Sequence, residues 1–443
     1  MKAAHRPGRV QRRGALLLAL SALLGCGSRS DPGAGERARL SLMLSPTERR
    51  FWIPLARSFE TSRPGVEVDL IEGPTSTDLR ENLYTTALLA EDDSLDLVYL
   101  DVTWTAKFAA AGWLLPLDRH FSAAELRAFL PAALDAGRIE GRLYRIPIRT
   151  DVGLLYYRRD LLAAAGFAAP QTFAELVRIA RALQSPPQRW GFLWQGSQYE
   201  GLVCVFLEVL RGHGGFWIDP ESRAVGLDRP AALAALEFLR RCRAQDPISP
   251  PGVTTYKEEE SRRLFQDGRA VFLRNWPYVW SLVQREDSPI AGRVGVQAVV
   301  HAPGAASAGT LGGWGLGVSR FSRHPELARA FIRHATSLES QRAFCLPTGY
   351  APARREAYDD PELTAANPFL LRLLAIHRHA VPRPMIPRYA MASDILQRHL
   401  SAALAGLESS KAALHEAAAE TRLLLVRRRS ETGADVARAA GSR

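Results

Sequence analysis

The chain has 443 residues, of which 47% are hydrophobic and 23% charged, and this composition excludes a disordered protein and is sufficient for two or three domains. The formal net charge is +11, and the clearest basic blocks lie near the two ends, at residues 2–13 and 427–429. Elsewhere arginines alternate with acidic residues. We interpret the charge as an arginine-rich solvated surface and expect no nucleic-acid partner; an anionic partner is the alternative.

An apolar run, ALLLALSALLGC, follows the basic N-terminus and ends at Cys26. It is too short to span a bilayer and has the length of a signal-peptide core. Residues 23–26 resemble a bacterial lipobox, in which cleavage leaves a cysteine that carries lipid. An ordinary secretory signal with an incidental cysteine is the alternative. We expect a lipoprotein signal peptide over 1–25 and a flexible tether over 26–37. The remaining chain is expected outside the cytoplasm, anchored to the cell membrane by lipid on Cys26. In a host with an outer membrane this location is the periplasm.

Strand and helix patterns alternate in the first part of the chain. Strands are expected over 38–45, 66–73 and 95–102, with helical patterns over 48–65, 79–93 and 103–117. This order predicts a parallel sheet with helices on its faces. Ligands of such sheets bind beyond the carboxyl ends of the strands. Residues 45–48, 73–77 and 101–104 are therefore the first candidates for a site.

A second set of elements begins near residue 150. Thr172 and Glu175 form a predicted capping box at the start of one helix. Three cysteines, Cys204, Cys242 and Cys345, lie in apolar contexts and are expected to be buried and free, with one disulfide as the alternative. No zinc-ligand spacing occurs, and we expect no metal or cofactor. Residues 152–166 are expected to run from a strand into a helix. Helices are expected over 172–185, 199–215, 229–246, 324–337 and most of 355–430, a strand over 269–275 leads into an aromatic stretch, and residues 294–304 and 310–319 flank a Gly/Ala/Ser loop.

Seven segments occur in an order that resembles a known family. They are YLDVTW (99–104), GWLLPLD (112–118), GLLYYRRDLL (153–162), WGFLWQGSQYEGLVCVFLEVLRGHGG (190–215), RNWPYVW (274–280), TLGGWGLGVS (310–319) and AVPRPMIP (380–387). Over residues 38–425 the chain resembles the solute-binding lipoproteins of bacterial and archaeal ABC sugar importers (solute-binding protein family 1), and most of all the trehalose/maltose-binding branch.

The resemblance implies an α/β fold, the two-lobed type II periplasmic-binding-protein fold, in which each lobe is a mostly parallel sheet flanked by helices. The lobes are joined by crossing hinge strands near 146–151, 296–300 and 349–353 and close on the ligand. The boundaries implied are 38–148 plus 297–350 for the N-terminal lobe, 149–296 plus 351–430 for the C-terminal lobe, and a disordered tail over 431–443.

The stretch NWPYVW places aromatic rings on a bent piece of chain after a strand. A sugar ring has one face rich in C–H groups, which an indole can cover. By resemblance Trp276 is the stacking residue, whereas Tyr278 and Trp280 are expected in the core; a hydrophobic cluster alone is the alternative. The resemblance also implies sugar contacts at Gly312, Gly313 and Trp314, for which a turn with a packed tryptophan is the alternative.

Charged candidates complete the expected substrate-binding set. Asp101 ends an apolar strand and could instead cap a helix; Glu48 could be an ordinary first-turn acid. Thr75 is a hydroxyl candidate or a cap. Asp151 has a sugar-binding counterpart in the family, and Arg383 a counterpart in the second lobe. Arg149 is the clearest departure, because the resembling branch carries tyrosine there.

The resemblance thus implies a monomeric binding protein without enzymatic activity. Its expected partners are an oligosaccharide, most simply a disaccharide such as trehalose or maltose, and the transmembrane subunits of an ABC permease with a cytoplasmic ATPase. A sugar-sensing lipoprotein is one alternative. A glycosidase is another, because paired carboxylates also hydrolyse glycosides.

Overall fold

The structure, a computed structural model, describes residues 37–440 and the side chains through residue 426. The expected signal peptide, Cys26 and nearly all of the tether lie outside the described residues. Within them, no helix is long and apolar enough to cross a membrane. All three cysteines expected to be free are buried and unpaired, as predicted.

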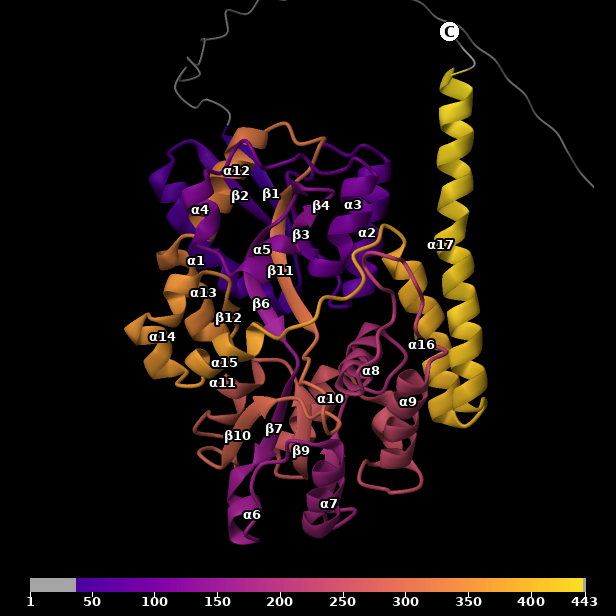
Figure 1. Ribbon diagram of the computed structural model, residues 1–443. Helices are drawn as coiled ribbons and strands as arrows, with labels where there is room; N and C mark the ends of the chain where they lie inside the picture. Colours follow the sequence, from indigo (N-terminus) through magenta and orange to yellow (C-terminus); the bar gives the residue numbers. More distant parts are fainter. Residues whose placement is uncertain (1–36, 441–443) are drawn as a thin grey trace, which may run out of the picture. The chain divides into compact units, whose positions relative to one another are not determined.

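The first sheet has six strands in the order β12-β6-β11-β3-β1-β2 (Figure 1). Its first three strands in the chain follow the expected alternation with helices, and β1 pairs in parallel with both β2 and β3. The strands of this sheet are β1 (Ala38–Leu44), β2 (Val66–Glu72), β3 (Leu97–Asp101), β6 (Ile146–Val152), β11 (Leu311–Val318) and β12 (Ala351–Pro352).

Helices and a small strand pair surround this sheet. The helices are α1 (Pro46–Ser62), α2 (Thr77–Leu89), α3 (Thr105–Ala110), α4 (Ala123–Arg127), α5 (Pro131–Asp135), α12 (Pro325–Ala335) and α13 (Leu338–Thr348), with the short 3₁₀ helix η1 (Val102–Trp104). The strand pair is β4 (Arg138–Ile139) and β5 (Arg142–Leu143).

The second sheet has four strands in the order β10-β7-β9-β8. They are β7 (Leu154–Arg158), β8 (Trp190–Leu193), β9 (Ala270–Asn275) and β10 (Val294–Ala298). The helices of this part are α6 (Arg159–Ala164), α7 (Phe173–Leu183), α8 (Glu200–Gly212), α9 (Pro230–Arg243), α10 (Glu258–Gln266), α11 (Val279–Val283), α16 (Tyr389–Ala405) and α17 (Ser410–Ala440), with η2 (Pro251–Thr255). The short helices η3 (Arg355–Tyr358) and α14 (Pro361–Ala366) pack on α13, and α15 (Leu370–His377) links them to β10.

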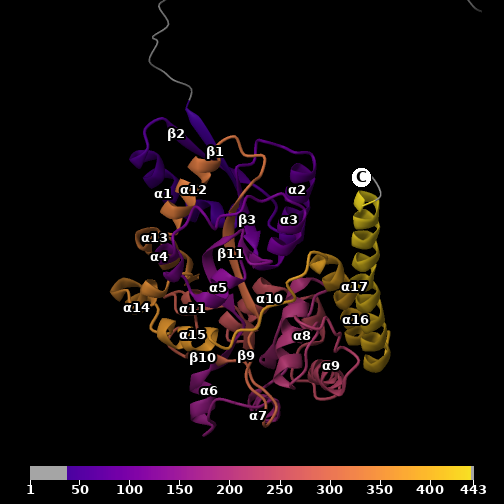
Figure 2. The same cartoon turned by 45° about the horizontal axis from the view of Figure 1, so that its top comes forward.

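Alternation along the strands of the second sheet separates two apolar cores. Leu154 and Tyr156 on β7 join the core that continues from the first sheet, whereas Leu155 between them joins the other. Successive side chains of a strand point to opposite faces, so each face of the sheet is covered by its own core. The second core contains α7, α8, α9 and α16, which lie together in Figures 1 and 2.

The two-lobed α/β expectation is confirmed, but the sheets are mixed rather than mostly parallel. Strand β11 runs antiparallel to both β3 and β6, and β7 runs antiparallel to β9 and β10. The reason is topological. Strand β6 carries the chain out of the first sheet and β11 brings it back, so the two must run in opposite directions.

Two boundaries differ from the expected ones. Strand β6 stays in the first sheet through Val152 and the chain changes sheets at Gly153, so the crossing lies just beyond residues 146–151. The segment expected to be a disordered tail is helical through Ala440 as the end of α17, in keeping with its alanine content. The predicted capping box of α7 is confirmed: Thr172 accepts from the Glu175 backbone N–H, and Glu175 accepts from that of Thr172.

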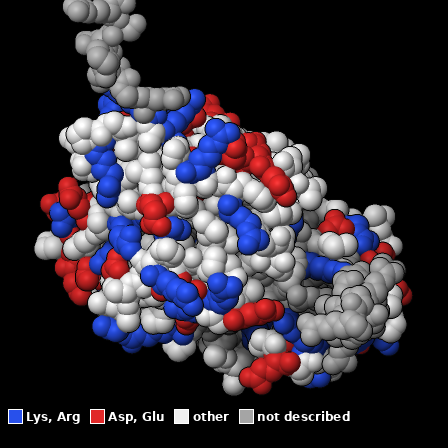
Figure 3. Space-filling view, turned by 90° about the horizontal axis from the view of Figure 1, so that it is seen from above, with Lys and Arg blue, Asp and Glu red and all other residues white. Residues whose placement is uncertain are grey.

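Basic and acidic side chains are intermixed over the face shown in Figure 3. This agrees with the interpretation of the net charge as an arginine-rich solvated surface.

Candidate functional site

Strand β11 brings together candidates that lie far apart in the chain. It runs between β3 and β6, so Trp314 is paired with Asp101 on one side and with Arg149 on the other. Gly312, two residues earlier, is paired with Asp151. The three charged candidates therefore surround the glycine-rich half of β11. Together with Glu48, Trp276 and Arg383, these residues are called the central cluster below.

Glycine is required in this half of β11. Gly313 has a backbone φ of +131°, and a Cβ there would lie 2.6 Å from the carbonyl oxygen of Arg149. A side chain would therefore push β11 away from β6. At Gly312 a Cβ would lie 3.3 Å from the Trp276 ring and 3.2 Å from the Asp151 Cβ. The missing side chain lets Trp276 lie directly against the strand.

Arg149 joins two carboxylates. Its Nη2 lies 3.3 Å from Glu48 Oε1, and its Nη1 pairs with Asp151 Oδ2. Glu48 is in the first turn of α1, directly after β1, which places it at the carboxyl end of the sheet. The Tyr350 hydroxyl donates to Glu48 Oε1 at 2.8 Å, and the Arg149 guanidinium lies 4.0 Å from the centre of the Tyr350 ring. Arg149 thus replaces the expected tyrosine with a cation that fills the space between the acids.

Burial and pairing act in opposite directions on these groups. Burial raises the pKa of Asp151, and the nearby Arg149 cation lowers it in part. Burial alone would lower the pKa of Arg149, but Asp151, Tyr99, Tyr350 and Glu48 together raise it well above its usual value. Arg149 therefore stays charged. Each acid still has one buried oxygen, Glu48 Oε2 or Asp151 Oδ1, that accepts no hydrogen bond from another described residue. Both oxygens can therefore accept a further hydrogen bond.

Asp101 has two partners of different kinds. Its Oδ1 accepts from the Thr103 backbone N–H at 3.0 Å, so it caps η1, which was the alternative interpretation of this residue. The same oxygen lies 3.2 Å from Arg383 Nη2. Arg383 Nη1 lies 2.7 Å from Glu200 Oε1 on α8, and Nε has no partner among the described residues. A cap and an ion pair therefore coexist, and one donor of Arg383 stays free.

The two tryptophans of the central cluster have different surroundings. Trp276 is partly exposed, with the Arg274 guanidinium 4.1 Å from its ring centre and its indole Nε1 3.4 Å from Glu258 Oε1. Trp314 is 7% exposed and packs among Tyr99 at 4.8 Å, Trp104 at 5.3 Å and Arg80 at 4.7 Å. Trp276 is thus the more accessible of the two rings, whereas Trp314 is mostly enclosed.

The remaining candidates lie outside the central cluster. Thr75 is an exposed residue in the loop between β2 and α2. Trp280 packs on Phe369 with a ring distance of 6.0 Å, and the Tyr278 hydroxyl donates to Glu259. Both aromatic rings are partly exposed at the margin of the core, whereas the sequence predicted that they would be enclosed in it. The turn at Pro277 ends β9 and starts a helix, which carries these rings to the edge.

Sequence reasoning missed four residues that support the cluster. Tyr350 and Tyr99 contact Arg149, and Glu200 holds Arg383. Arg145 is buried, and burial lowers its pKa to about 10 although Asp101 raises it. Tyr350 lies in the expected crossing at 349–353, so its position could have indicated it. The other three carry no sequence signal, since their partners are distant in the chain.

This arrangement suits a polyhydroxylated ligand. It combines a partly exposed indole with buried carboxylate oxygens, which can accept hydrogen bonds from hydroxyl groups, and with a free guanidinium N–H, which can donate one. Hydrogen bonds in which one partner is charged are stronger than those between neutral groups. Among the described residues no group of three or more His, Cys, Asp or Glu side chains could hold a metal ion.

The fold has two sheets that are linked by crossing strands. Polar and aromatic side chains converge beside these crossings, which is the arrangement of a two-lobed binding protein. The chain belongs to the bacterial extracellular solute-binding protein family, whose model matches residues 45–342. The resemblance found in the sequence is thereby confirmed.

Individual relatives agree with this assignment. A probable ABC transporter-binding protein of Deinococcus radiodurans is 36% identical over 73% of this chain and 77% of that protein. A mannitol-binding protein of Pseudomonas aeruginosa is 26% identical over 83% of this chain and 88% of that protein. Among solved structures, maltose-bound MalE3 of T. maritima superimposes with a TM-score of 0.82 and 40% identity, over 87% of this chain and 99% of that one.

Proposed function

We propose that the protein is the substrate-binding subunit of an ABC importer that captures an oligosaccharide outside the cytoplasmic membrane and delivers it to the permease. The observation that carries this proposal is the central cluster, in which Trp276 lies against Gly312 beside the unpartnered oxygens of Glu48 and Asp151. The maltose-bound relative at 40% identity supports a disaccharide such as maltose or trehalose. The relative named as a mannitol-binding protein makes a polyol the alternative ligand.

Binding without chemistry is favoured over glycoside hydrolysis. A glycosidase needs one carboxylic acid that protonates the leaving oxygen and a second carboxylate that acts on the ring. Here Glu48 and Asp151 share one arginine, and Asp101 pairs with Arg383. Burial raises the pKa of Asp151, but the adjacent Arg149 cation stabilises its ionised form and so opposes a role as an acid. The pairing suits acceptors of hydroxyl hydrogen bonds.

A thermal-shift screen tests the proposal. The mature protein is heated with maltose, trehalose, maltotriose and mannitol, and calorimetric titration follows for each sugar that raises the melting temperature. A ligand at 100 times its Kd stabilises the folded state by about 2.7 kcal/mol, which is readily detected. The same incubations are analysed for released glucose. Binding without glucose release supports the proposal; release would favour a glycosidase, and no shift with any sugar would contradict carbohydrate capture.

We also propose that the protein is anchored to the membrane by lipid on Cys26. The support is the lipobox-like sequence 23–26 after a short apolar run. The variant Cys26→Ser should lose labelling by a radioactive fatty acid and leave the membrane fraction. Continued partition of this variant into detergent would contradict the anchor and leave the binding proposal untouched.

A further inference from the structure

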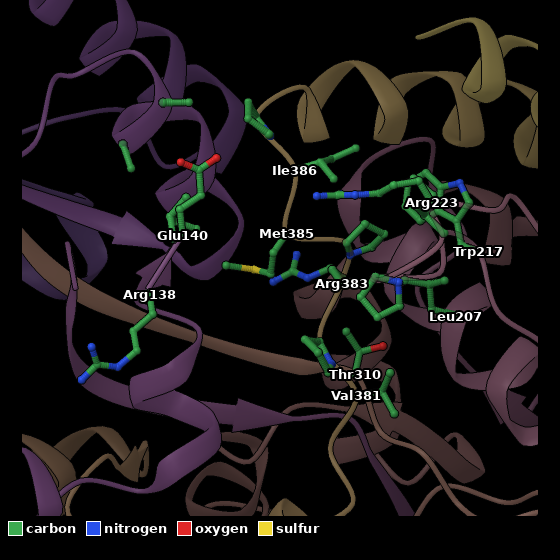
Figure 4. A pocket seen from close by; sticks show the side chains of 18 of the residues that line it. Arg138, Glu140, Leu207, Trp217, Arg223, Thr310, Val381, Arg383, Met385 and Ile386 are labelled. Atoms are coloured by element: carbon green, nitrogen blue, oxygen red, sulfur yellow. The ribbon is translucent and has the colours of Figure 1, made fainter. Parts of the chain in front are cut away.

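A cavity lies next to the central cluster. It has a volume of about 590 Å³. One wall is the β4–β5 strand pair with the end of α3; the other is α8, the loop around Trp217 and residues 381–387. Figure 4 shows Arg383 and Met385 projecting into the space between these walls. Arg383 also pairs with Asp101, so the cavity and the central cluster share one side chain.

The charged groups around this cavity are mostly cationic. Arg142, Arg211 and Arg223 line it and make no salt bridge with another described residue. Arg138 also belongs to the lining, but it pairs with Asp118 at 3.2 Å, and its guanidinium is directed away from Arg383 in Figure 4. The lining contains one acidic residue, Glu140. The charges of Arg142, Arg211 and Arg223 are therefore not paired in a salt bridge with another described residue, whereas those of Arg138 and Arg383 are.

Two buried nitrogen donors at the cavity also lack acceptors. The indole Nε1 of Trp217, a residue that is 2% exposed, has no hydrogen-bond partner among the described residues, and neither has Nε of Arg383. A buried donor without an acceptor is costly, so such groups mark places where a ligand or water is expected. A ligand with hydrogen-bond acceptors could satisfy both of these donors and the arginines that have no salt bridge within the described part of the chain.

Partial burial of one arginine, Arg211, distinguishes this cavity from an ordinary solvated surface. Arg142 and Arg223 are exposed at the rim, whereas Arg211 on α8 is only partly exposed. Burial lowers the pKa of Arg211, and Asp219 compensates only in part. A solvated arginine would not bear this cost. Guanidinium groups bind carboxylates and phosphates in a bidentate manner, which makes either anion a suitable occupant.

We propose that this cavity is a subsite for an anionic substituent, a carboxylate or a phosphate ester, on a sugar whose neutral ring occupies the central cluster. The inference rests on the proposed function and specifies its substrate class: acidic rather than only neutral oligosaccharides. The apolar part of the lining, including Trp217, Met385 and Ile386, covers the carbon skeleton next to the anionic group.

Calorimetric titration with three related probes tests the subsite: maltose, maltose 6′-phosphate and the 6′-uronic acid of maltose. The double variant Arg211→Gln/Arg223→Gln removes two cations of the cavity and none of the central cluster. Arg229→Gln is the matched control, because Arg229 lies in the same stretch of chain, 4.7 Å from the Phe216 ring, and does not line the cavity. Melting temperatures establish that both variants fold.

At low ionic strength at least one anionic probe should bind about tenfold or more tightly than maltose, with an advantage that falls as salt is added. The double variant should lose that advantage and bind maltose as the parent does; the control should retain it. The probe with the advantage identifies the anion. Equal binding of maltose and both anionic probes would overturn the subsite alone, as would an advantage that survives the double variant. Failure of all three probes to bind would count against the proposed function as well.

Discussion

At the scale of single residues, Arg149 determines the charge balance of the central cluster. Its guanidinium contacts Glu48 and Asp151, both less than 10% exposed, and lies against Tyr350. Without it, two buried carboxylates would face each other with no cation between them. Removal of one partner of a buried ion pair typically costs about 3–5 kcal/mol, because the remaining charge is left uncompensated.

The variant Arg149→Ala should therefore lose about 3–5 kcal/mol of unfolding free energy at pH 7.5. The loss should be smaller at pH 5. The folded-state pKa of Asp151 is already raised by burial, and it rises further without the arginine, so protonation at lower pH favours the folded form. Urea unfolding at both pH values measures this. The double variant Arg149→Ala/Asp151→Asn should recover part of the stability; an equal loss at both pH values would contradict the argument.

Trp276 and Trp280 should respond differently to truncation. Trp276→Ala should weaken sugar binding about 5- to 150-fold, by analogy with the roughly 1–3 kcal/mol of aromatic stacking on a nucleobase, and change the melting temperature little. Trp280→Ala should keep sugar affinity but lose roughly 2 kcal/mol of unfolding free energy. This is about half of what truncation of a fully buried tryptophan costs, because the Trp280 ring is partly exposed. Titration and thermal unfolding of both variants separate the roles; unchanged sugar affinity in Trp276→Ala would exclude it from the site.

At the scale of elements, α15 carries a buried titratable group. His377 is its last residue, and burial lowers the pKa of this imidazole to about 4. Its Nε2 has no hydrogen-bond partner among the described residues. The folded protein therefore holds His377 neutral, whereas the unfolded chain protonates it near its ordinary value of about 6.5.

Acid should destabilise the protein through His377. Because the folded pKa is depressed, this contribution to stability is complete above about pH 6.5 and is lost as the pH falls toward 4. The full loss is roughly 3 to 4 kcal/mol, which corresponds to the lowering of the pKa from about 6.5 to about 4. The difference in unfolding free energy between pH 7 and pH 4.5 should shrink in His377→Gln. His379→Gln is the control, since His379 is exposed two residues further on. An identical pH profile for the parent and His377→Gln would contradict this assignment.

At the scale of the whole molecule, contacts of the central cluster connect the two sheets. Asp101 ends a strand of the first sheet, and Arg383 links it to Glu200 on α8, which packs in the core of the second sheet. Trp276 follows β9 of the second sheet and lies against Gly312 of the first. A ligand at these residues would contact both lobes and so favour their closed arrangement.

Binding should therefore reduce the radius of gyration. Small-angle scattering of the parent protein with saturating maltose should give a smaller radius than without sugar. Trp276→Ala at the same maltose concentration should show a smaller change, because fewer molecules carry sugar. An unchanged radius in the parent, with saturation established by calorimetry, would contradict closure.

Local features of the sequence were sufficient for the α/β class, the capping box of α7, the buried free cysteines and the strand ends that carry Glu48 and Asp101. These depend on neighbours within a few residues, whose periodicity and side-chain chemistry can be read directly. The family resemblance added the two lobes and the candidates Asp151, Trp276, Trp314 and Arg383.

Only the tertiary structure decided which of these residues meet. Glu48 bonds to Tyr350 and Asp101 to Arg383, pairs separated by 302 and 282 residues, and no local pattern encodes such contacts. They arise because β11 returns antiparallel between β3 and β6, which follows from the packing of whole elements. The same packing gave Arg149 two acidic partners and left Arg211 and Arg223 of the neighbouring cavity without a salt bridge to any described residue, since long-range charge balance depends on where distant segments are folded together.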